Sequence, residues 1–276
     1  MGEVRLLTNG DLPALGRLLA PWPVETVQVA AQVRSHGLSE RAGGTDILGY
    51  WESNRLMSIL WRGYSLHPVG ASSDGLDAFC DNLGPRRVGS IVGVREAAMG
   101  LWHRLCQRAP RHWAHPREVR EHQPVLMITT APNITPDPHV DVVATRHLAS
   151  YHKASVAMYT EEVGVPPIDS GGSYRDHVAS LMTRGLTLGV LVEGSVIFKA
   201  DVVATAGSVC QIGGVWLAPQ LRGHGLSEPL MAGVVARCRA EYDTVSLYAN
   251  AYNTVALRCY AAVGFHQVNE FSTILY

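Results

Sequence analysis

The segment 209–238 constrains the fold more than any other part of the sequence. An apolar run that ends at Leu217 is followed by the turn Gln220-Leu-Arg-Gly-His-Gly225, and then by a stretch whose apolar residues recur with the helical period. Pro219 ends the first element, and Pro229 fits only in the first turn of a helix. The segment therefore predicts a β-strand, a glycine-rich turn and an α-helix in succession, as in an α/β sheet.

The rest of 139–276 continues this alternation of strands and helices. We expect strands at 140–146, 187–193, 195–205, 208–217 and 244–250, helices at 147–163, 174–184 and 253–263, and a final pair of strands that reaches residue 276. With the helix after the glycine-rich turn, the order is β-α-α-β-β-β-α-β-α-β-β. This order predicts a mixed central sheet of the α/β (α+β) class.

The first half has a similar opening order. Its expected strands lie at 4–7, 47–51, 56–64 and 88–92, and its helical segments begin at residue 11 and cover 24–36 and 95–108. No strong sequence repeat accompanies this order. We therefore expect the first half to be a diverged, degenerate copy of the second.

A proline-rich stretch at 131–138 separates the two halves. Its three prolines favour extended, non-helical backbone. The stretch predicts a linker between an N-terminal domain at 1–130 and a second domain at 139–276, and a chain of 276 residues is long enough for two domains.

The composition argues against several other classes of protein. Lysine and arginine total 23 against 24 acidic residues, which argues against a general nucleic-acid-binding surface. No apolar run approaches the ~18 residues that span a bilayer, and the first residues form no apolar signal core, so we expect a cytoplasmic protein without membrane contact. The five cysteines form no CxxC pair and the histidines show no ligand spacing, so we expect reduced, buried thiols and no metal site.

The glycine-rich turn also predicts an anion site. Gly223 and Gly225 precede a helix N-terminus, where unpaired amides and the positive end of the helix dipole attract negative charge. The glycines let phosphate oxygens approach the backbone, and Arg222 adds a cation. The turn is neither a nucleotide P-loop, which needs Gly-Lys-Ser/Thr, nor a Rossmann fingerprint, which needs a third glycine. The alternative is a turn that requires glycine for its conformation alone.

A second motif follows at 246–265. Asn253 is a good N-cap for the expected helix, and Gly264 ends that helix. Asn253, Ala256 and Tyr260 lie at i, i+3 and i+7, so they share one face, and the small alanine leaves room for a thin ligand. The alternative is that Tyr260 packs in the core with its hydroxyl satisfied.

These two motifs resemble those of the GNAT superfamily of acyl-CoA-dependent N-acyltransferases. The turn at 220–225 matches the family's Q/R-x-x-G-x-G/A phosphate loop, and Asn253-x-x-Ala-x-x-x-Tyr260 with the following Gly264-Phe265 matches its later helix. The order of elements in 139–276 is similar too. The whole chain resembles a two-domain GNAT type of high-GC bacteria whose N-terminal half is an uncharacterised domain.

The resemblance implies acetyl-CoA as co-substrate. Its pyrophosphate would lie on the amides after the glycine turn, and its pantetheine arm between the strands at 209–217 and 244–250, held apart by a bulge at Gly213-Gly214. Tyr260 would protonate the leaving thiolate, and a backbone amide near Val215 would stabilise the oxyanion. The implied cofactor-binding residues are Val215, Trp216, Leu217, Arg222, Gly223, His224, Gly225, Leu226, Ser227, Asn250, Asn253 and Tyr260.

The resemblance does not extend to the general base. The family often carries a glutamate on the strand before the phosphate loop, whereas this strand has Gln211 and no carboxylate. The candidates are Glu161 and Glu162 near the expected acceptor entrance, Asp201 beside Lys199, and a chain of water molecules. The alternatives are a solvated helix end for the two glutamates and an ordinary surface pair for Asp201.

The expected function is therefore transfer of an acetyl group from acetyl-CoA to an amine by direct attack, with a small molecule or a protein as acceptor. Two alternatives remain open: a tandem-GNAT enzyme of thiol-cofactor biosynthesis similar to mycothiol synthase, and a CoA-sensing module without turnover. In the first half, the glycines of 88–94 lead into Arg95 without a Gly-x-Gly, so we expect no CoA binding there. That half would supply surface, as a wall of the acceptor cleft or as a homodimer contact.

Overall fold

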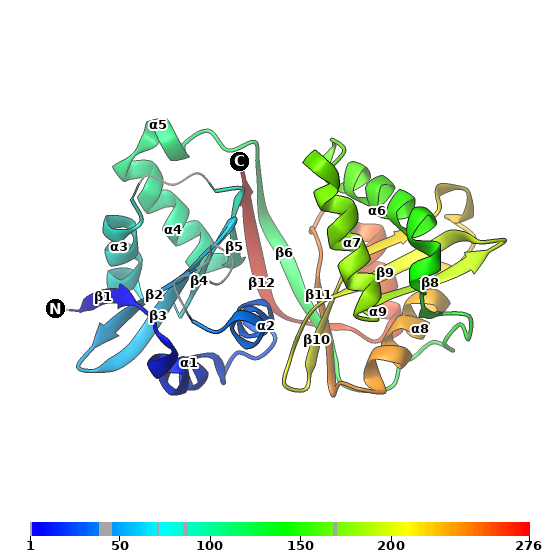
Figure 1. Cartoon of the computed structure of the whole chain (residues 1–276), viewed down its shortest axis with the longest axis horizontal. Helices are drawn as coiled ribbons and strands as arrows, with labels where there is room; N and C mark the ends of the chain where they lie inside the picture. Colours follow the sequence, from blue (N-terminus) through cyan, green and yellow to red (C-terminus); the bar gives the residue numbers. More distant parts are fainter. Residues whose placement is uncertain (1, 39–45, 71, 85–87, 168–169) are drawn as a thin grey trace. The chain divides into compact units, whose positions relative to one another are not determined.

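The chain forms two compact units, and each unit contains segments that are separated in the sequence (Figure 1). The computed structural model describes residues 2–38, 46–70, 72–84, 88–167 and 170–276. The first unit contains Met1–Val125, Tyr248–Tyr252 and Gln267–Tyr276, and the second contains Leu126–Leu247 and Asn253–His266. After it has entered the second unit, the chain therefore returns to the first unit twice.

The first unit is built on a mixed sheet. Its elements are β1 (Glu3–Leu6), α1 (Leu12–Leu19), α2 (Val27–His36), β2 (Asp46–Glu52), β3 (Arg55–Arg62), β4 (Ser65–Val69), α3 (Ser73–Asn82), β5 (Ser90–Val94), α4 (Arg95–Arg108), α5 (Pro110–Trp113), β6 (Glu118–Ile128) and β12 (His266–Leu275). Strands β1 to β4 form an antiparallel meander, β5 pairs parallel with β4, and β12 pairs antiparallel with β5. The strand order is β1-β2-β3-β4-β5-β12-β6, and β6 passes into the second unit after Val125.

Helices cover both faces of this first sheet. On β2, Leu48 joins the apolar cluster formed with α3 and α4, whereas its neighbour Ile47 joins the cluster formed with α1 and α2. Leu60 and Ile59 divide in the same way on β3. Burial on both faces explains why these strands are apolar throughout rather than alternating.

The second unit repeats this design. Its elements are β7 (Asp141–Val142), α6 (Leu148–Val163), α7 (Ser173–Thr183), β8 (Thr187–Val192), β9 (Ser195–Ala206), β10 (Val209–Leu217), α8 (Ser227–Arg239), β11 (Thr244–Tyr248) and α9 (Thr254–Val263). Strands β7 to β10 form an antiparallel meander, and β11 pairs parallel with β10. Helices α6 and α7 pack on β9 through Tyr151, Val178 and Val196.

Both halves follow the order β-α-α-β-β-β-α-β-α, from β1 to α4 and from β7 to α9. The prediction of a mixed α/β fold with a degenerate copy in the first half is confirmed. The first half also contains β4, α3 and β6, which the sequence did not indicate.

Two expected strands in the second half were wrong. The strand at 140–146 is only Asp141–Val142, because the chain turns into a short 3-10 helix at Thr145–His147. The final pair of strands is the single strand β12. Its segment, 266–275, contains no glycine or proline that would break it into two.

The proline-rich stretch at 131–138 lies along two helices of the second unit. The amide of Asn133 donates to the carbonyl of Val263 at 2.8 Å, and the amide of Asp137 donates to the carbonyl of Pro229 at 2.9 Å. Carbonyl groups of α8 and α9 thus accept hydrogen bonds from backbone amides of a segment that lies outside the strands.

Candidate active site

The pairing of β10 with its neighbours changes along the strand. Toward β11 it covers Val209–Gln211, opposite Thr244–Ser246, and toward β9 the register shifts between Gly213 and Trp216. Gly214 has a φ of +57°, a conformation that favours glycine. The predicted bulge is therefore present, and it lies just beyond the point where the ladder between β10 and β11 ends.

The turn between β10 and α8 is open. Gly223 and Gly225 have φ of +78° and +72°, which side-chain-bearing residues avoid. Among the described residues, no atom lies within 4 Å of a Cβ built at either glycine. Leu226 at the N-cap makes no side-chain cap, so the first amides of α8 face an exposed turn and suit an anion.

The corresponding helix of the first unit, α3, is capped at its N-terminus. The Ser72 hydroxyl accepts a hydrogen bond from the amide of Gly75 at 3.1 Å. Helix α3 thus gives a first-turn amide to its own cap. The segment 88–94 contains β5, which corresponds in element order to β11 and not to β10, so it is not the counterpart of the glycine-rich turn.

Arg222, in the open turn, is held by α6. Its Nη2 donates to Glu161 Oε2 at 2.8 Å and its Nε donates to the carbonyl of Leu217 at 2.9 Å. Trp216 Nε1 donates to the other oxygen, Glu161 Oε1, at 3.1 Å, and His224 Nδ1 lies 3.0 Å from the carbonyl of Arg222. The Arg222–Glu161 pair is nearly half exposed, so it contributes at most ~1 kcal/mol and can exchange partners.

Tyr260 lies near the end of α9 with its ring against Phe265, at 5.9 Å between centroids. The side chain is 8% exposed, and its hydroxyl has no hydrogen-bond partner among the described residues. Burial raises the pKa of Tyr260 well above its usual range, and the Cys259 thiol and the Glu162 carboxylate raise it further. The hydroxyl therefore stays protonated at neutral pH and can donate a proton.

The two asparagines of the motif are engaged differently. Asn253 Oδ1 accepts a hydrogen bond from the amide of Ala256 at 3.2 Å, so it caps α9 as predicted and keeps its amide nitrogen for another acceptor. Asn250 belongs to the first unit and is buried there. Its Oδ1 accepts from Gln123 Nε2 at 2.8 Å, and Gln123 in turn accepts from Thr273.

A buried ion pair lies against the bulge of β10. Lys199 Nζ donates to Asp201 Oδ2 at 2.6 Å and to the carbonyl of Gly214 at 2.9 Å, and the Tyr151 hydroxyl donates to Asp201 Oδ1 at 2.6 Å. Burial, and then the Asp201 charge, raise the pKa of Tyr151 well above its usual range. The pair is not at the surface, and both oxygens of Asp201 are engaged. The sequence signal was the spacing of two, which places Lys199 and Asp201 on one face of an apolar strand.

Glu162 lies near a group of tyrosines on α6 and α7. The rings of Tyr159 and Tyr174 meet edge to face at 5.7 Å, and the Tyr174 hydroxyl donates to the carbonyl of Ser155 at 3.2 Å. Burial raises the pKa of Tyr174 to about 12, with smaller contributions from Asp201, Tyr159 and Glu162. The charge of Glu162 therefore acts on both Tyr174 and Tyr260.

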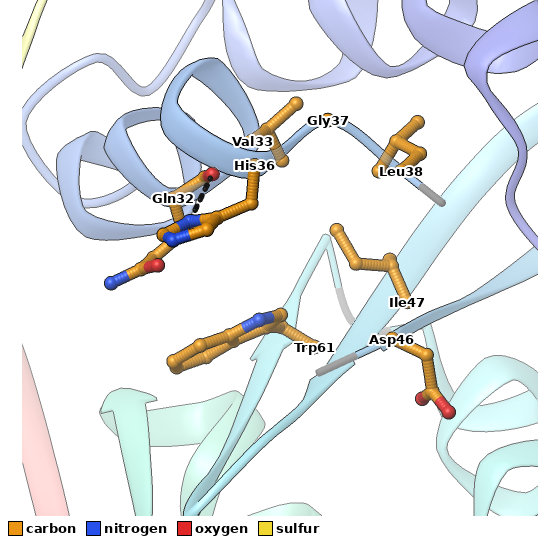
Figure 2. Close-up of a pocket in the computed structure, with 8 residues that line it drawn as sticks. All are labelled: Gln32, Val33, His36, Gly37, Leu38, Asp46, Ile47 and Trp61. Carbon is orange, nitrogen blue, oxygen red and sulfur yellow. Dashed lines mark hydrogen bonds between the residues drawn. The ribbon is translucent and has the colours of Figure 1, made fainter. Parts of the chain in front are cut away.

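The first unit contains a small pocket (Figure 2). This pocket is too small for a ligand with an anionic group of the kind that suits the turn before α8. Its volume of about 20 Å³ holds roughly one water molecule. It is lined by Gln32, Val33, His36, Gly37, Leu38, Asp46, Ile47 and Trp61.

The described ranges contain no cluster of three or more histidines, cysteines or acidic residues able to hold a metal ion. In the same ranges, no helix is both long and apolar enough to cross a membrane.

Two family models match successive parts of the chain. Residues 176–265 match the acetyltransferase (GNAT) family, and residues 45–151 match a domain of unknown function (DUF4081). No curated protein matches the sequence.

Solved structures share the fold along the whole chain. A GNAT-family acetyltransferase from Colwellia psychrerythraea aligns with a TM-score of 0.59 at 12% identity, covering 99% of each chain. A GCN5-related N-acetyltransferase from Sphaerobacter thermophilus aligns with a TM-score of 0.57 at 17% identity, covering 99% of this chain and 94% of that one. A tandem GNAT protein from the clavulanic acid biosynthesis pathway aligns with a TM-score of 0.54 at 13% identity, covering 100% and 98%. The chain therefore contains a GNAT acetyltransferase domain, preceded by a DUF4081 domain, on a fold that it shares with a tandem GNAT protein.

Proposed function

We propose that the second unit transfers an acetyl group from acetyl-CoA to the amine of a small molecule or a protein. The observation that carries this proposal is the uncapped N-terminus of α8, reached through Gly223 and Gly225, together with the bulge in β10 that follows the end of its ladder with β11. This combination suits a long ligand with an anionic group at one place and amides at another. The GNAT family match supports acyl-CoA as that ligand.

The donor would be bound by three kinds of group. The amides of residues 222–227 and the Arg222 guanidinium would take the pyrophosphate. The main chain of residues 215–217 would pair with the amides of the pantetheine arm. The Asn253 amide nitrogen would donate to the same arm, because the oxygen of that side chain already caps α9.

In the proposed reaction, a neutral amine attacks the thioester carbonyl directly. The carbonyl oxygen becomes an oxyanion, which the amide of Val215 stabilises. The carbon–sulfur bond then breaks, and the thiolate takes the proton of the Tyr260 hydroxyl. The nitrogen loses one proton to a base, from which Tyr260 is reprotonated, and the products are the N-acetyl amine and CoA.

The base in this proposal is Glu162, which is exposed and lies near enough to Tyr260 for its charge to raise the pKa of that hydroxyl. Asp201 is the weaker candidate, because both of its oxygens accept hydrogen bonds within the buried pair, from Lys199 and Tyr151. Glu162 would accept the proton directly or through water.

Calorimetry with CoA tests the donor site. Gly225→Val puts a β-branched side chain at a φ of +72°, where the phosphate would approach, so CoA affinity should fall at least ~10-fold. Gly207→Val is the matched control. Gly207 has a φ of +56° in the turn between β9 and β10, and its Cβ would also meet no described atom within 4 Å. This variant should keep its CoA affinity.

Thiol release from acetyl-CoA in the presence of a panel of amines tests the reaction. Release that depends on one amine, with formation of its N-acetyl derivative, supports the proposal. Absence of CoA binding by the wild-type protein would overturn it. CoA binding without thiol release for any amine class would instead support the CoA-sensing alternative.

A further inference from the structure

Lys199 is an unusual residue for its position. The chain has only two lysines, Lys153 and Lys199, among 23 basic residues. Lys199 lies in the middle of β9 and is 0% exposed. Burial of an ammonium group is unfavourable unless an opposite charge and hydrogen-bond acceptors compensate for the lost water.

The surroundings of Lys199 supply acceptors from two directions. Asp201 Oδ2 neutralises the charge at 2.6 Å, and the carbonyl of Gly214 accepts a second hydrogen bond at 2.9 Å. The Tyr151 hydroxyl fixes the other oxygen of Asp201. A buried ion pair of this kind is often no more stabilising than apolar residues of the same volume. Stability alone therefore does not explain why a charge is kept here.

The second acceptor connects Lys199 with the bulge. Peptide bonds are planar, and none of the described ones is cis. The amide of Val215 therefore points away from the carbonyl of Gly214, and so away from Lys199. Gly214 packs tightly against this group, because a Cβ built on it would lie 2.5 Å from Asp201 Oδ2 and 2.9 Å from Lys199 Nζ. The orientation of the Gly214–Val215 peptide is thus fixed by the ion pair.

A cation at a carbonyl oxygen also changes the amide on the other side of the peptide. It draws electron density toward the oxygen, which makes the N–H group a stronger hydrogen-bond donor. The effect is large in a water-free environment, where charges are poorly screened. Here the N–H group that becomes a stronger hydrogen-bond donor is that of Val215.

We propose that Lys199 is a positioning residue for acyl transfer: it orients and polarises the Gly214–Val215 peptide so that the Val215 amide binds the thioester carbonyl and stabilises its oxyanion. This inference rests on the proposed function. Lys199 does not touch the substrate, and Asp201 and Tyr151 serve to hold its ammonium group in place.

Lys199→Met tests this role, because methionine keeps the length and volume of the side chain without its charge. Acetyl-CoA labelled with ¹³C at the thioester carbonyl is bound to each protein, and the carbonyl stretch is recorded by isotope-edited infrared spectroscopy. In the wild-type protein the band should move to lower frequency than in water. In Lys199→Met it should return toward the value in water, while CoA affinity stays unchanged.

Turnover gives an independent readout. With an amine that the wild-type protein acetylates, Lys199→Met should lower kcat about 10-fold or more, since the oxyanion donor is weakened, and should leave KM for acetyl-CoA unchanged. Lys153→Met is the matched control, because it removes the other lysine of the chain, on α6. It should change neither the band nor kcat.

Lys199→Met leaves Asp201 as a buried, unpaired carboxylate and can destabilise the fold. The double variant Lys199→Met with Asp201→Asn removes both charges and should recover stability without recovering the band shift or kcat. A folded variant that lacks Lys199 and keeps the wild-type band and kcat overturns the inference. If the wild-type protein binds no acetyl-CoA, the proposed function itself is wrong.

Discussion

At the scale of single residues, Tyr260 carries the proposed proton transfer. Tyr260→Phe should reduce turnover by ~10²-fold, because the thiolate then leaves without a proton donor. CoA affinity should hardly change, because the ring and its contact with Phe265 are kept. Steady-state kinetics and calorimetry check both parts. Tyr252→Phe, at a tyrosine that is 68% exposed, is the control. An unchanged kcat in Tyr260→Phe would assign the proton to another group.

His67, on β4, makes the stability of the first unit depend on pH. It is 1% exposed, and its Nε2 has no hydrogen-bond partner among the described residues. Burial lowers its pKa to about 4, against 6.5 for an exposed histidine. Between these values the unfolded chain binds the proton and the folded chain does not, so stability falls as pH decreases from 6.5 toward 4. The slope for one such group is up to ~1.4 kcal/mol per pH unit.

Urea denaturation at several pH values measures this slope. His67→Leu removes the titrating group from an apolar site, so its stability should depend less on pH over the same range. A variant with the same slope as the wild-type protein would show that other groups cause the acid sensitivity.

At the scale of elements, the bulge in β10 depends on the absence of a side chain at Gly214. Gly214→Ala adds a Cβ at a φ of +57° and within 2.9 Å of both Lys199 and Asp201. Gly194→Ala, in the turn between β8 and β9, adds one at a φ of +77° with no described atom within 4 Å. In the control variant, the free energy of unfolding measured by urea denaturation should fall by ~1–2 kcal/mol, from backbone strain alone. Gly214→Ala should lose roughly 2 kcal/mol more from overpacking, and turnover should fall with it. An equal loss of unfolding free energy in the two variants would show that crowding of the ion pair by the added Cβ does not destabilise the protein.

The elements also show how far sequence reasoning reaches. The cap at Asn253, the bulge at Gly213-Gly214 and the open glycine turn were all predictable, because each depends on residues that are adjacent in sequence. The engagement of Glu161 by Arg222, and that of Asp201 by Tyr151, was not predictable. These contacts join residues 61 and 50 positions apart, and only the packing of α6 on β9 and β10 brings them together.

The pairing of β12 was beyond sequence reasoning for the same reason. Strand β12 follows α9 of the second unit, yet it pairs with β5 of the first. Its composition indicates a strand but says nothing about which edge it joins. The order of elements from β8 to α9 was therefore readable from the sequence, whereas β4, α3 and β6 of the first half and the pairing of β12 with β5 were not.

At the scale of the whole molecule, the first unit should not fold without β12. Phe271 and Ile274 of this strand are 1% and 0% exposed, and Ile274 packs in the apolar cluster that the sheet forms with α3 and α4. A protein that ends after His266 should therefore lose the protected amides of β5, measured by hydrogen exchange. CoA binding by the second unit should persist. The milder variant Ile274→Ala should destabilise the first unit by ~2–5 kcal/mol. Full protection of β5 in the truncated protein would contradict the prediction.

The pairing of β12 with β5 also sets an order of events during biosynthesis. Ribosomes release the chain from its N-terminus, so β1 to β5 emerge long before residues 266–275. Until then β5 presents an unpaired edge with apolar residues on both faces, a state that favours aggregation. The N-terminal unit is thus synthesised first but completed last, and the β5 edge stays unpaired for as long as the ribosome takes to translate the chain from β5 to β12.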